Sequence, residues 1–287
     1  MGIALIAVSG CMERLFYHPE AGPTPPPAQG IELVSFASAD GTALVGWFIP
    51  ARSAPQPAPT ILHVHGNAGN ITSHDWFSAY LPPAGFNVFI FDYRGYGQSA
   101  GRATRRRDLI ADADAALDVL LARPDVNPGT IGVYGQSLGG GIALNLAAAR
   151  PEIRSVVTES AFASWRLVAA TALGGDPPGF LARVVAWVFI RDHDRPDDAI
   201  ARIDRPVLVL HGGDDEIVPP SHGRRLGAAG GPGTRFVELP GGRHNSLRES
   251  HPQIEGMIID FFRATLIDAP GPAGHDAIRT DDDDPDG

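Results

Sequence analysis

The sequence predicts an α/β fold, in which a mostly parallel eight-stranded sheet carries helices on both faces and a short helical cap insertion. Two observations lead to this prediction. Apolar runs of strand length alternate with helix-length segments along most of the chain, an order typical of parallel sheets with right-handed crossovers. The chain also has 287 residues, of which 44% are apolar, which favours one large domain over two small ones.

Eight apolar runs are expected to form the strands. The first two flank Ala39-Asp40-Gly41, where Asp-Gly indicates a tight turn, so we expect an antiparallel hairpin there. The other six are expected to pair in parallel, because each is separated from the next by a longer segment. The expected strands are residues 31–38, 42–50, 60–65, 86–92, 130–135, 153–160, 206–211 and 235–239.

Helix-length segments lie between and after these strands. In residues 105–122, Leu109, Ala113, Leu117 and Leu120 recur at the spacing of one helix face. The segment 161–202 interrupts the alternation; it is too long for a loop and rich in Trp, Phe, Val and Leu, so we expect a helical cap. The expected helices of the main domain are residues 73–81, 105–122, 138–149, 220–229 and 250–265.

Two terminal regions are expected to lie outside the folded domain. Residues 1–30 combine an apolar start with a Pro-rich spacer at 21–29, which can form neither helix nor sheet. Residues 267–287 read as a disordered acidic tail, because they are rich in Pro, Gly and Asp. We therefore expect the α/β domain to span residues 31–266, with the cap at about 161–202.

The single cysteine, Cys11, excludes an internal disulfide and a multi-cysteine zinc site. Val8-Ser9-Gly10-Cys11 resembles the bacterial lipobox, whose cysteine becomes a lipidated amino terminus; this would anchor the protein in the cell envelope. No basic residue precedes the apolar stretch, which is also short for a signal sequence, and a true start further upstream would explain both. The alternative is a buried or frayed segment with an incidental cysteine, in a cytoplasmic protein.

Composition excludes several classes of partner. The formal net charge is −10, which offers no electrostatic attraction to the phosphate backbone of a nucleic acid or to anionic lipid. His63 and His65 alternate along an expected strand and could bind a metal ion. However, no further His or Asp follows at the spacing of a binuclear hydrolase. We expect neither a metal nor an organic cofactor, and the sequence leaves the oligomeric state open.

The strongest chemical signal is Gly-Gln-Ser-Leu-Gly at residues 135–139. A Gly-x-Ser-x-Gly between a buried strand and a helix of small residues is typical of a nucleophile elbow, a strained turn that lifts the Ser137 hydroxyl above the sheet. A dinucleotide-binding fingerprint fits poorly, since it would need glycine at position 137. A glycine-rich turn without catalytic meaning remains the alternative.

A serine hydroxyl needs a base, and the base needs an orienting acid. In this architecture both follow the serine, first the acid after a later strand and then a histidine near the C-terminus. Asp215 and His244 meet this order: each follows an expected strand. Asp214 of the same loop and Glu159 at the end of another strand are the alternative acids, and the loop carboxylates Asp214, Asp215 and Glu216 could also form only a solvated acidic turn. We expect Glu159 to tie the root of the cap.

The negative oxygen of a tetrahedral intermediate needs donors that are already in place. These are normally the amide after the nucleophile and one from the loop after the third strand. The sequence therefore predicts that the amides of Leu138 and Asn67 form the oxyanion hole. The glycines around Asn67 would let the backbone turn toward the serine.

Five motifs in this order resemble the α/β-hydrolase superfamily, and within it the serine-hydrolase branch that contains eukaryotic α/β-hydrolase-domain proteins related to protein depalmitoylases. The resemblance covers residues 31–262 and implies an α/β-hydrolase fold with Ser137, Asp215 and His244 as the triad. It is also the reason for preferring Asp215 to Asp214. The motifs are His-Gly-Asn-Ala-Gly-Asn at 65–70, Phe-Asp-Tyr-Arg-Gly-Tyr-Gly-Gln-Ser at 91–99, Gly-Gln-Ser-Leu-Gly-Gly at 135–140, His-Gly-x-x-Asp-x-x-Val-Pro at 211–219 and Gly-x-His-Asn at 242–245.

Together these residues predict a serine hydrolase that cleaves carboxylic esters or thioesters through an acyl-enzyme intermediate. The apolar cap favours an acyl or aryl substrate over a charged one, although a cap that merely covers the sheet would have the same composition. Two alternatives remain open. One is an aminopeptidase-like serine peptidase on the same fold, and the other is a catalytically silent binding protein.

Overall fold

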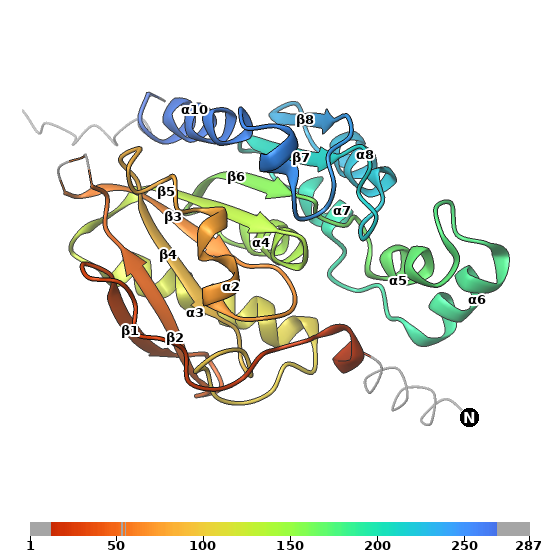
Figure 1. The fold of residues 1–287 in the computed structure, drawn as a ribbon, viewed down its shortest axis with the longest axis horizontal. Coiled ribbons are helices and arrows are strands. Elements are labelled where there is room, and N and C mark those ends of the chain that lie inside the picture. The colour runs from red at the N-terminus through yellow and green to blue at the C-terminus, as the bar shows by residue number, and fades with distance from the viewer. Residues whose placement is uncertain (1–12, 53, 55, 269–287) are drawn as a thin grey trace, which may run out of the picture.

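The computed structural model describes residues 13–52, 54 and 56–268, and it confirms the predicted fold (Figure 1). A single eight-stranded sheet has the order β1-β2-β4-β3-β5-β6-β7-β8. β2 pairs antiparallel with β1 and β4, and all other neighbours pair in parallel. The strands are β1 (Glu32–Ala37), β2 (Ala43–Ile49), β3 (Ala58–Val64), β4 (Asn87–Asp92), β5 (Val126–Gln136), β6 (Ile153–Glu159), β7 (Val207–Gly212) and β8 (Thr234–Leu239).

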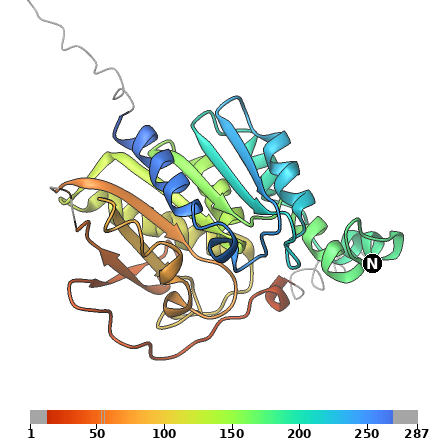
Figure 2. The ribbon, with the colours of Figure 1, turned by 45° about the horizontal axis from the view of Figure 1, so that its top comes forward.

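Helices cover both faces of the sheet, as Figure 2 shows. One hydrophobic cluster joins the sheet to α3, α4, α7 and α8, and a second joins the opposite face to α2 and α10. Strand interiors are buried on both sides, which explains why the strands read as nearly continuous apolar runs. The helices of the main domain are α2 (Ile71–His74), η2 (Asp75–Phe77), α3 (Arg106–Ala122), α4 (Leu138–Ala149), α7 (Pro196–Ile200), α8 (Pro220–Ala229), α9 (Leu247–Ser250) and α10 (Ile254–Leu266).

Two predicted helices are shorter than expected, and proline accounts for both. The segment 73–81 forms only the end of α2 and the single turn η2. Pro82 and Pro83 follow directly, and proline disfavours helical conformation in the residue before it. The last helix begins at Ile254 rather than at 250 because Pro252 interrupts it near its expected start.

The N-terminal part of the described chain packs against the domain, so the boundary predicted at residue 31 is wrong. Tyr17 is buried in the main core. Glu20 and Gly22 donate backbone hydrogen bonds to Gly69 (2.9 Å) and Gly97 (2.8 Å), in the loops after β3 and β4. The Pro-rich chain has no sheet or helix of its own, and this leaves its main-chain groups free to bond these loops. Cys11 and the acidic tail beyond residue 268 lie outside the described residues.

The segment predicted as a cap contains three helices: α5 (Trp165–Gly174), α6 (Phe180–Phe189) and α7. α5 and α6 pack against each other and project beyond the end of the sheet (Figure 1), whereas α7 packs on α4 and α8. Within the described part of the chain, none of the helices combines the length and apolar character needed to cross a bilayer.

Candidate active site

The turn between β5 and α4 has the geometry of a nucleophile elbow. Ser137 has φ 53° and ψ −114°, a strained conformation for a residue with a side chain. A Cβ added to Gly139 would lie 1.8 Å from the carbonyl oxygen of Val64, so the helix can approach β3 only because this residue is glycine. The Ser137 N–H donates to the carbonyl of Glu159 at 2.8 Å, which holds the strained residue in place.

The structure brings the three predicted catalytic side chains together. His244 Nε2 lies 3.0 Å from Ser137 Oγ, and His244 Nδ1 lies 2.7 Å from Asp215 Oδ2. Both His244 and Asp215 are buried, although each comes from a loop: His244 follows the edge strand β8, and Asp215 follows its neighbour β7. The contacts form a continuous hydrogen-bonded chain from carboxylate to imidazole to hydroxyl, the arrangement that activates a serine.

The loop after β7 carries three carboxylates, and its conformation places that of Asp215 beside His244. The amides of Ile217 and Val218 donate to Asp215 Oδ1 at 3.0 Å and 2.7 Å, which leaves Oδ2 for the histidine. Glu216 instead pairs with Arg243 at the surface, 3.1 Å away. The position of Asp215 at the start of this turn therefore decides which carboxylate faces inward.

Electrostatics keep Asp215 ionised. Burial opposes its charge, but the hydrogen bonds from His244 and from the Val218 amide help to outweigh burial and hold the pKa of Asp215 below its ordinary value. Burial lowers the pKa of neighbouring His211, whose Nε2 lies 2.7 Å from the carbonyl of Val218 and donates to it. Neutral His211 thus packs beside the carboxylate without competing for it as a cation.

The two predicted oxyanion donors come from segments that touch. Leu138 is the first residue of α4, where an amide has no partner within the helix. Asn67 lies in the loop after β3, and a Cβ on the preceding Gly66 would lie only 2.0 Å from Gln136 Oε1, so this loop closes directly on the elbow. The loop that carries Asn67 and the start of α4 are therefore in contact at the elbow, and the role of the two amides stays a prediction.

The Asn67 side chain has a structural role that the sequence did not reveal. Its Nδ2 donates to the carbonyl of Phe16. Its Oδ1 accepts from the His18 N–H at 3.1 Å and from the Tyr96 hydroxyl at 2.9 Å. The N-terminal segment thereby fixes the loop that carries the candidate oxyanion amide, and no motif in residues 16–18 indicates this contact.

Glu159 does not tie the root of the cap, so that prediction is wrong. Its carboxylate accepts from the Tyr134 hydroxyl at 2.6 Å and from Arg248 Nη1 at 2.8 Å. Glu159 ends β6, and alternation along the strand turns its side chain toward β5 and α9 instead. It is therefore also not the acid that orients His244.

His63 and His65 have internal partners. His63 Nδ1 lies 2.8 Å from Ser78 Oγ, and His65 Nδ1 lies 2.8 Å from the carbonyl of Gly66. His65 Nε2 has no hydrogen-bond partner among the described residues and faces Asp92 at 3.7 Å. Burial lowers the pKa of both histidines well below the ordinary value, so both are neutral.

The buried carboxyl group of Asp92 lies next to the loop that carries Asn67. Its pKa leads us to expect that the stability of the protein depends on pH. Burial raises its pKa from 3.8 to about 7, even though the amides of Ile71 and Gln98 donate to it. The folded protein therefore keeps this proton at pH values where the unfolded chain has lost it. The free energy of unfolding should fall as the pH rises from about 4 to about 7, by on the order of 4 kcal/mol from this group.

Urea unfolding at several pH values in this range, on the wild type and on Asp92→Asn, tests the prediction. We expect a smaller decline of the unfolding free energy with pH in the variant. The slopes are compared rather than the absolute values, because the asparagine amide would face the Gln98 N–H. The lowered pKa of His65 makes the free energy of unfolding rise with pH, which is opposite to the effect of Asp92. His65 is present in both proteins, so the comparison of slopes removes its contribution. Parallel slopes would contradict the assignment.

Comparisons with known proteins agree with this geometry. The family model for the alpha/beta hydrolase fold matches residues 59–195. The protein YfhR of Escherichia coli strain K12 is 34% identical over 260 residues, which cover 88% of each chain. The alpha/beta hydrolase domain-containing protein WAV2 of Arabidopsis thaliana is 37% identical over 226 residues, covering 74% of this chain and 72% of WAV2. This chain belongs to the α/β-hydrolase family.

Solved structures place the hydrolase in the same fold. An esterase of Pyrococcus furiosus superposes with a TM-score of 0.70 and 19% identity, covering 88% of this chain and 98% of the esterase. A puromycin-hydrolyzing peptidase of Mycobacterium tuberculosis gives a TM-score of 0.66 and 19% identity, covering 85% of this chain and 41% of the peptidase. At this level of identity, both structures inform the fold of the hydrolase and not its substrate.

Proposed function

We propose that this α/β-hydrolase is a serine hydrolase that cleaves carboxylic esters or thioesters. The observation that carries the proposal is the continuous chain from Asp215 through His244 to Ser137, with contacts of 2.7 Å and 3.0 Å. Ser137 also sits at the tip of a strained elbow, where its hydroxyl is available to a substrate.

In the proposed reaction, His244 Nε2 takes the proton of Ser137 Oγ as that oxygen attacks the carbonyl carbon. Asp215 holds the imidazole through Nδ1 and stabilises the imidazolium that forms. The amides of Asn67 and Leu138 donate to the developing oxyanion. His244 then protonates the leaving alcohol or thiol, and water, activated by the same imidazole, releases the acid from Ser137.

The substrate class is proposed from the composition of the cap segment 161–202, which is rich in Trp, Phe, Val and Leu. Burial of an acyl or aryl group against apolar side chains is favourable. A peptidase with the same triad is the second candidate, because it uses the same nucleophile and base. A silent binding protein is less well supported, since the three side chains are already aligned for proton transfer.

Two experiments test the proposal. A fluorophosphonate probe should label the wild type at Ser137 and leave Ser137→Ala unlabelled; a folded wild type that resists the probe would contradict the hydrolase assignment. Turnover of p-nitrophenyl esters with acyl chains of increasing length, compared with aminoacyl-anilides, distinguishes the two candidate activities. We expect the esters to be the better substrates and the anilides to show little turnover.

We also propose that Cys11 is lipidated and attaches the hydrolase to the cell envelope. The support is the lipobox-like sequence Val8-Ser9-Gly10-Cys11. Intact mass spectrometry of the protein purified from its native host tests this. The expected result is a diacylglyceryl adduct on Cys11, and an unmodified cysteine would refute it.

A further inference from the structure

Helix α6 of the cap carries apolar surface that the rest of the described chain leaves uncovered. Its sequence, FLARVVAWVF, is apolar on every side except at Arg183. Ala182 and Ala186 are buried, whereas most large apolar side chains of the helix face outward. The exposed apolar residues of the cap, which we call the cap face, are Leu173 (63% exposed), Phe180 (83%), Leu181 (73%), Val184 (39%) and Trp187 (67%).

The cap face is a continuous surface and not a scatter of single residues. Phe180, Val184 and Trp187 are spaced by four and three residues, so they form one stripe along α6. A helix that is apolar all round is normally buried, and contiguous exposed apolar surface marks a site of association. Phenylalanine, leucine and tryptophan are also the residues that enter the boundary between lipid headgroups and acyl chains.

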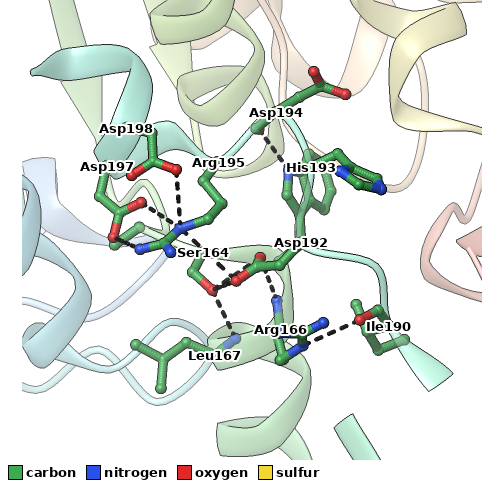
Figure 3. A network of polar contacts seen from close by, with 12 residues as sticks. Ser164, Arg166, Leu167, Ile190, Asp192, His193, Asp194, Arg195, Asp197 and Asp198 are labelled. Atoms are coloured by element: carbon green, nitrogen blue, oxygen red, sulfur yellow. Dashed lines mark hydrogen bonds and ion pairs between the residues drawn. The ribbon is translucent and has the colours of Figure 1, made fainter. Parts of the chain in front are cut away.

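The cap is fixed to the domain by a polar network, shown in Figure 3. Asp192 accepts from Ser164 Oγ at 2.9 Å and from the Arg166 N–H at 3.1 Å. Trp165 Nε1 donates to the carbonyl of Asp194 at 3.0 Å. These bonds join the start of α5 to the segment that follows α6. Arg106 of α3 donates to the carbonyls of Arg191 and His193 at 2.6 Å and 2.9 Å, so the cap face has a set position relative to the rest of the protein.

The net charge of −10 predicts no overall attraction to anionic lipid, but positive charge is concentrated locally beside the cap face. The segment after α6 meets the start of α3 at a cavity of about 320 Å³, whose wall contains four arginines and two carboxylates. Both Arg105 and Arg107 are exposed at its edge. Arginines beside an apolar surface complement anionic lipid headgroups, whereas a second copy of the chain would add like charge at this face. The cavity is lined by Glu13, Arg105, Arg106, Arg107, Arg191, His193 and Asp194.

The chain enters the structure at this same place. Glu13 accepts from Arg106 Nη2 at 2.6 Å, and Phe16 lines an apolar cavity of about 160 Å³ together with residues of α5 and α6. Leu173 of the cap face lines the same cavity as Phe16, so the first described residues of the chain pack beside the cap face.

We propose that the cap face is a membrane-docking surface that binds lipid bilayers containing anionic headgroups. The apolar side chains of α6 enter the interface, and the arginines at the start of α3 contact the headgroups. Docking does not depend on the proposed reaction. It orients the cap, and the end of the sheet beyond which the cap projects, toward the bilayer.

Sedimentation with lipid vesicles tests the proposal. The full chain with Cys11→Ser, which cannot carry the lipid, should bind phosphatidylcholine vesicles that contain 30% phosphatidylglycerol. Adding Phe180→Asp and Trp187→Asp should weaken binding at least about tenfold, since two aromatic side chains no longer enter the interface. The matched control is Leu33→Asp, a 48%-exposed leucine on β1, which should leave binding unchanged.

Other outcomes would overturn the proposal. Equal binding of all these variants would place membrane contact elsewhere, in the apolar N-terminal residues for example. A dimer that Phe180→Asp dissociates, seen by light scattering, would make the cap face an interface between copies. Brominated lipid should quench the fluorescence of Trp187 in the bound protein and lose that effect in Trp187→Phe. Fluorophosphonate labelling should stay the same in every variant, which separates this test from that of the reaction.

Discussion

Replacement of Ser137 by alanine is expected to lower kcat/KM for an ester substrate by about 10⁴-fold or more, with the fold intact. The alanine has no oxygen to attack the carbonyl, and the oxyanion amides alone leave only a small rate enhancement. Initial rates with a p-nitrophenyl ester measure the effect. Ser246→Ala is the matched control: Ser246 lies two residues from His244 and makes no capping bond with its side chain. A Ser137→Ala variant with more than a tenth of the wild-type rate would refute the assignment.

The strained backbone at Ser137 also predicts a difference in stability between two variants at this position. Ser137 has φ 53° and ψ −114°, a conformation that glycine adopts without strain. Ser137→Gly should therefore unfold at higher urea concentration than Ser137→Ala, by about 1 kcal/mol after the greater entropy of the unfolded glycine chain is subtracted. Both variants lack the hydroxyl that contacts His244, so the loss of this contact is common to both and does not contribute to the difference. Equal stabilities would mean that the elbow stores no strain.

The fold could be predicted from the sequence because the inner strands of the sheet are buried on both faces and therefore consist of nearly continuous apolar residues. The residues of the candidate site could be predicted for a related reason. Ser137, Asp215 and His244 each follow a strand, and the carboxyl ends of parallel strands meet at one edge of the sheet. Strand order along the chain is thus enough to bring residues 107 positions apart into contact.

Some contacts depend on the route that the chain takes in space and not on a periodic pattern of apolar residues. These contacts could not be predicted from the sequence. Proline-rich sequence indicates only that residues 21–29 form no helix or sheet; it does not say that Glu20 and Gly22 bond the loops beside the site. The exposure of the Phe180 and Trp187 side chains could not be predicted from the sequence either. An apolar helix has the same sequence whether it covers the sheet or projects from it, and only the packing of α5 and α6 decides between them.

Loss of the Arg248 side chain is expected to destabilise the hydrolase by about 3–5 kcal/mol. Arg248 Nη1 lies 2.8 Å from Glu159 Oε1, and the two side chains are only 10% and 1% exposed. In Arg248→Met the Glu159 carboxylate would remain buried with the Tyr134 hydroxyl but without a positive partner. Urea unfolding measures the loss. Arg224→Met, which breaks an exposed pair with Glu238, is the matched control and should cost less than about 1 kcal/mol.

The double variant Glu159→Gln/Arg248→Met decides whether the loss comes from the unpaired charge. With the carboxylate also neutralised, part of the stability should return, since a buried ion pair contributes little net energy and is costly mainly when one partner remains. Activity adds a second readout. The carbonyl of Glu159 binds the Ser137 N–H, so a disturbed β6 end should lower kcat in Arg248→Met more than in the double variant. If the double variant is as unstable as Arg248→Met, the arginine acts through its packing on Phe77 and Tyr80 rather than through its charge.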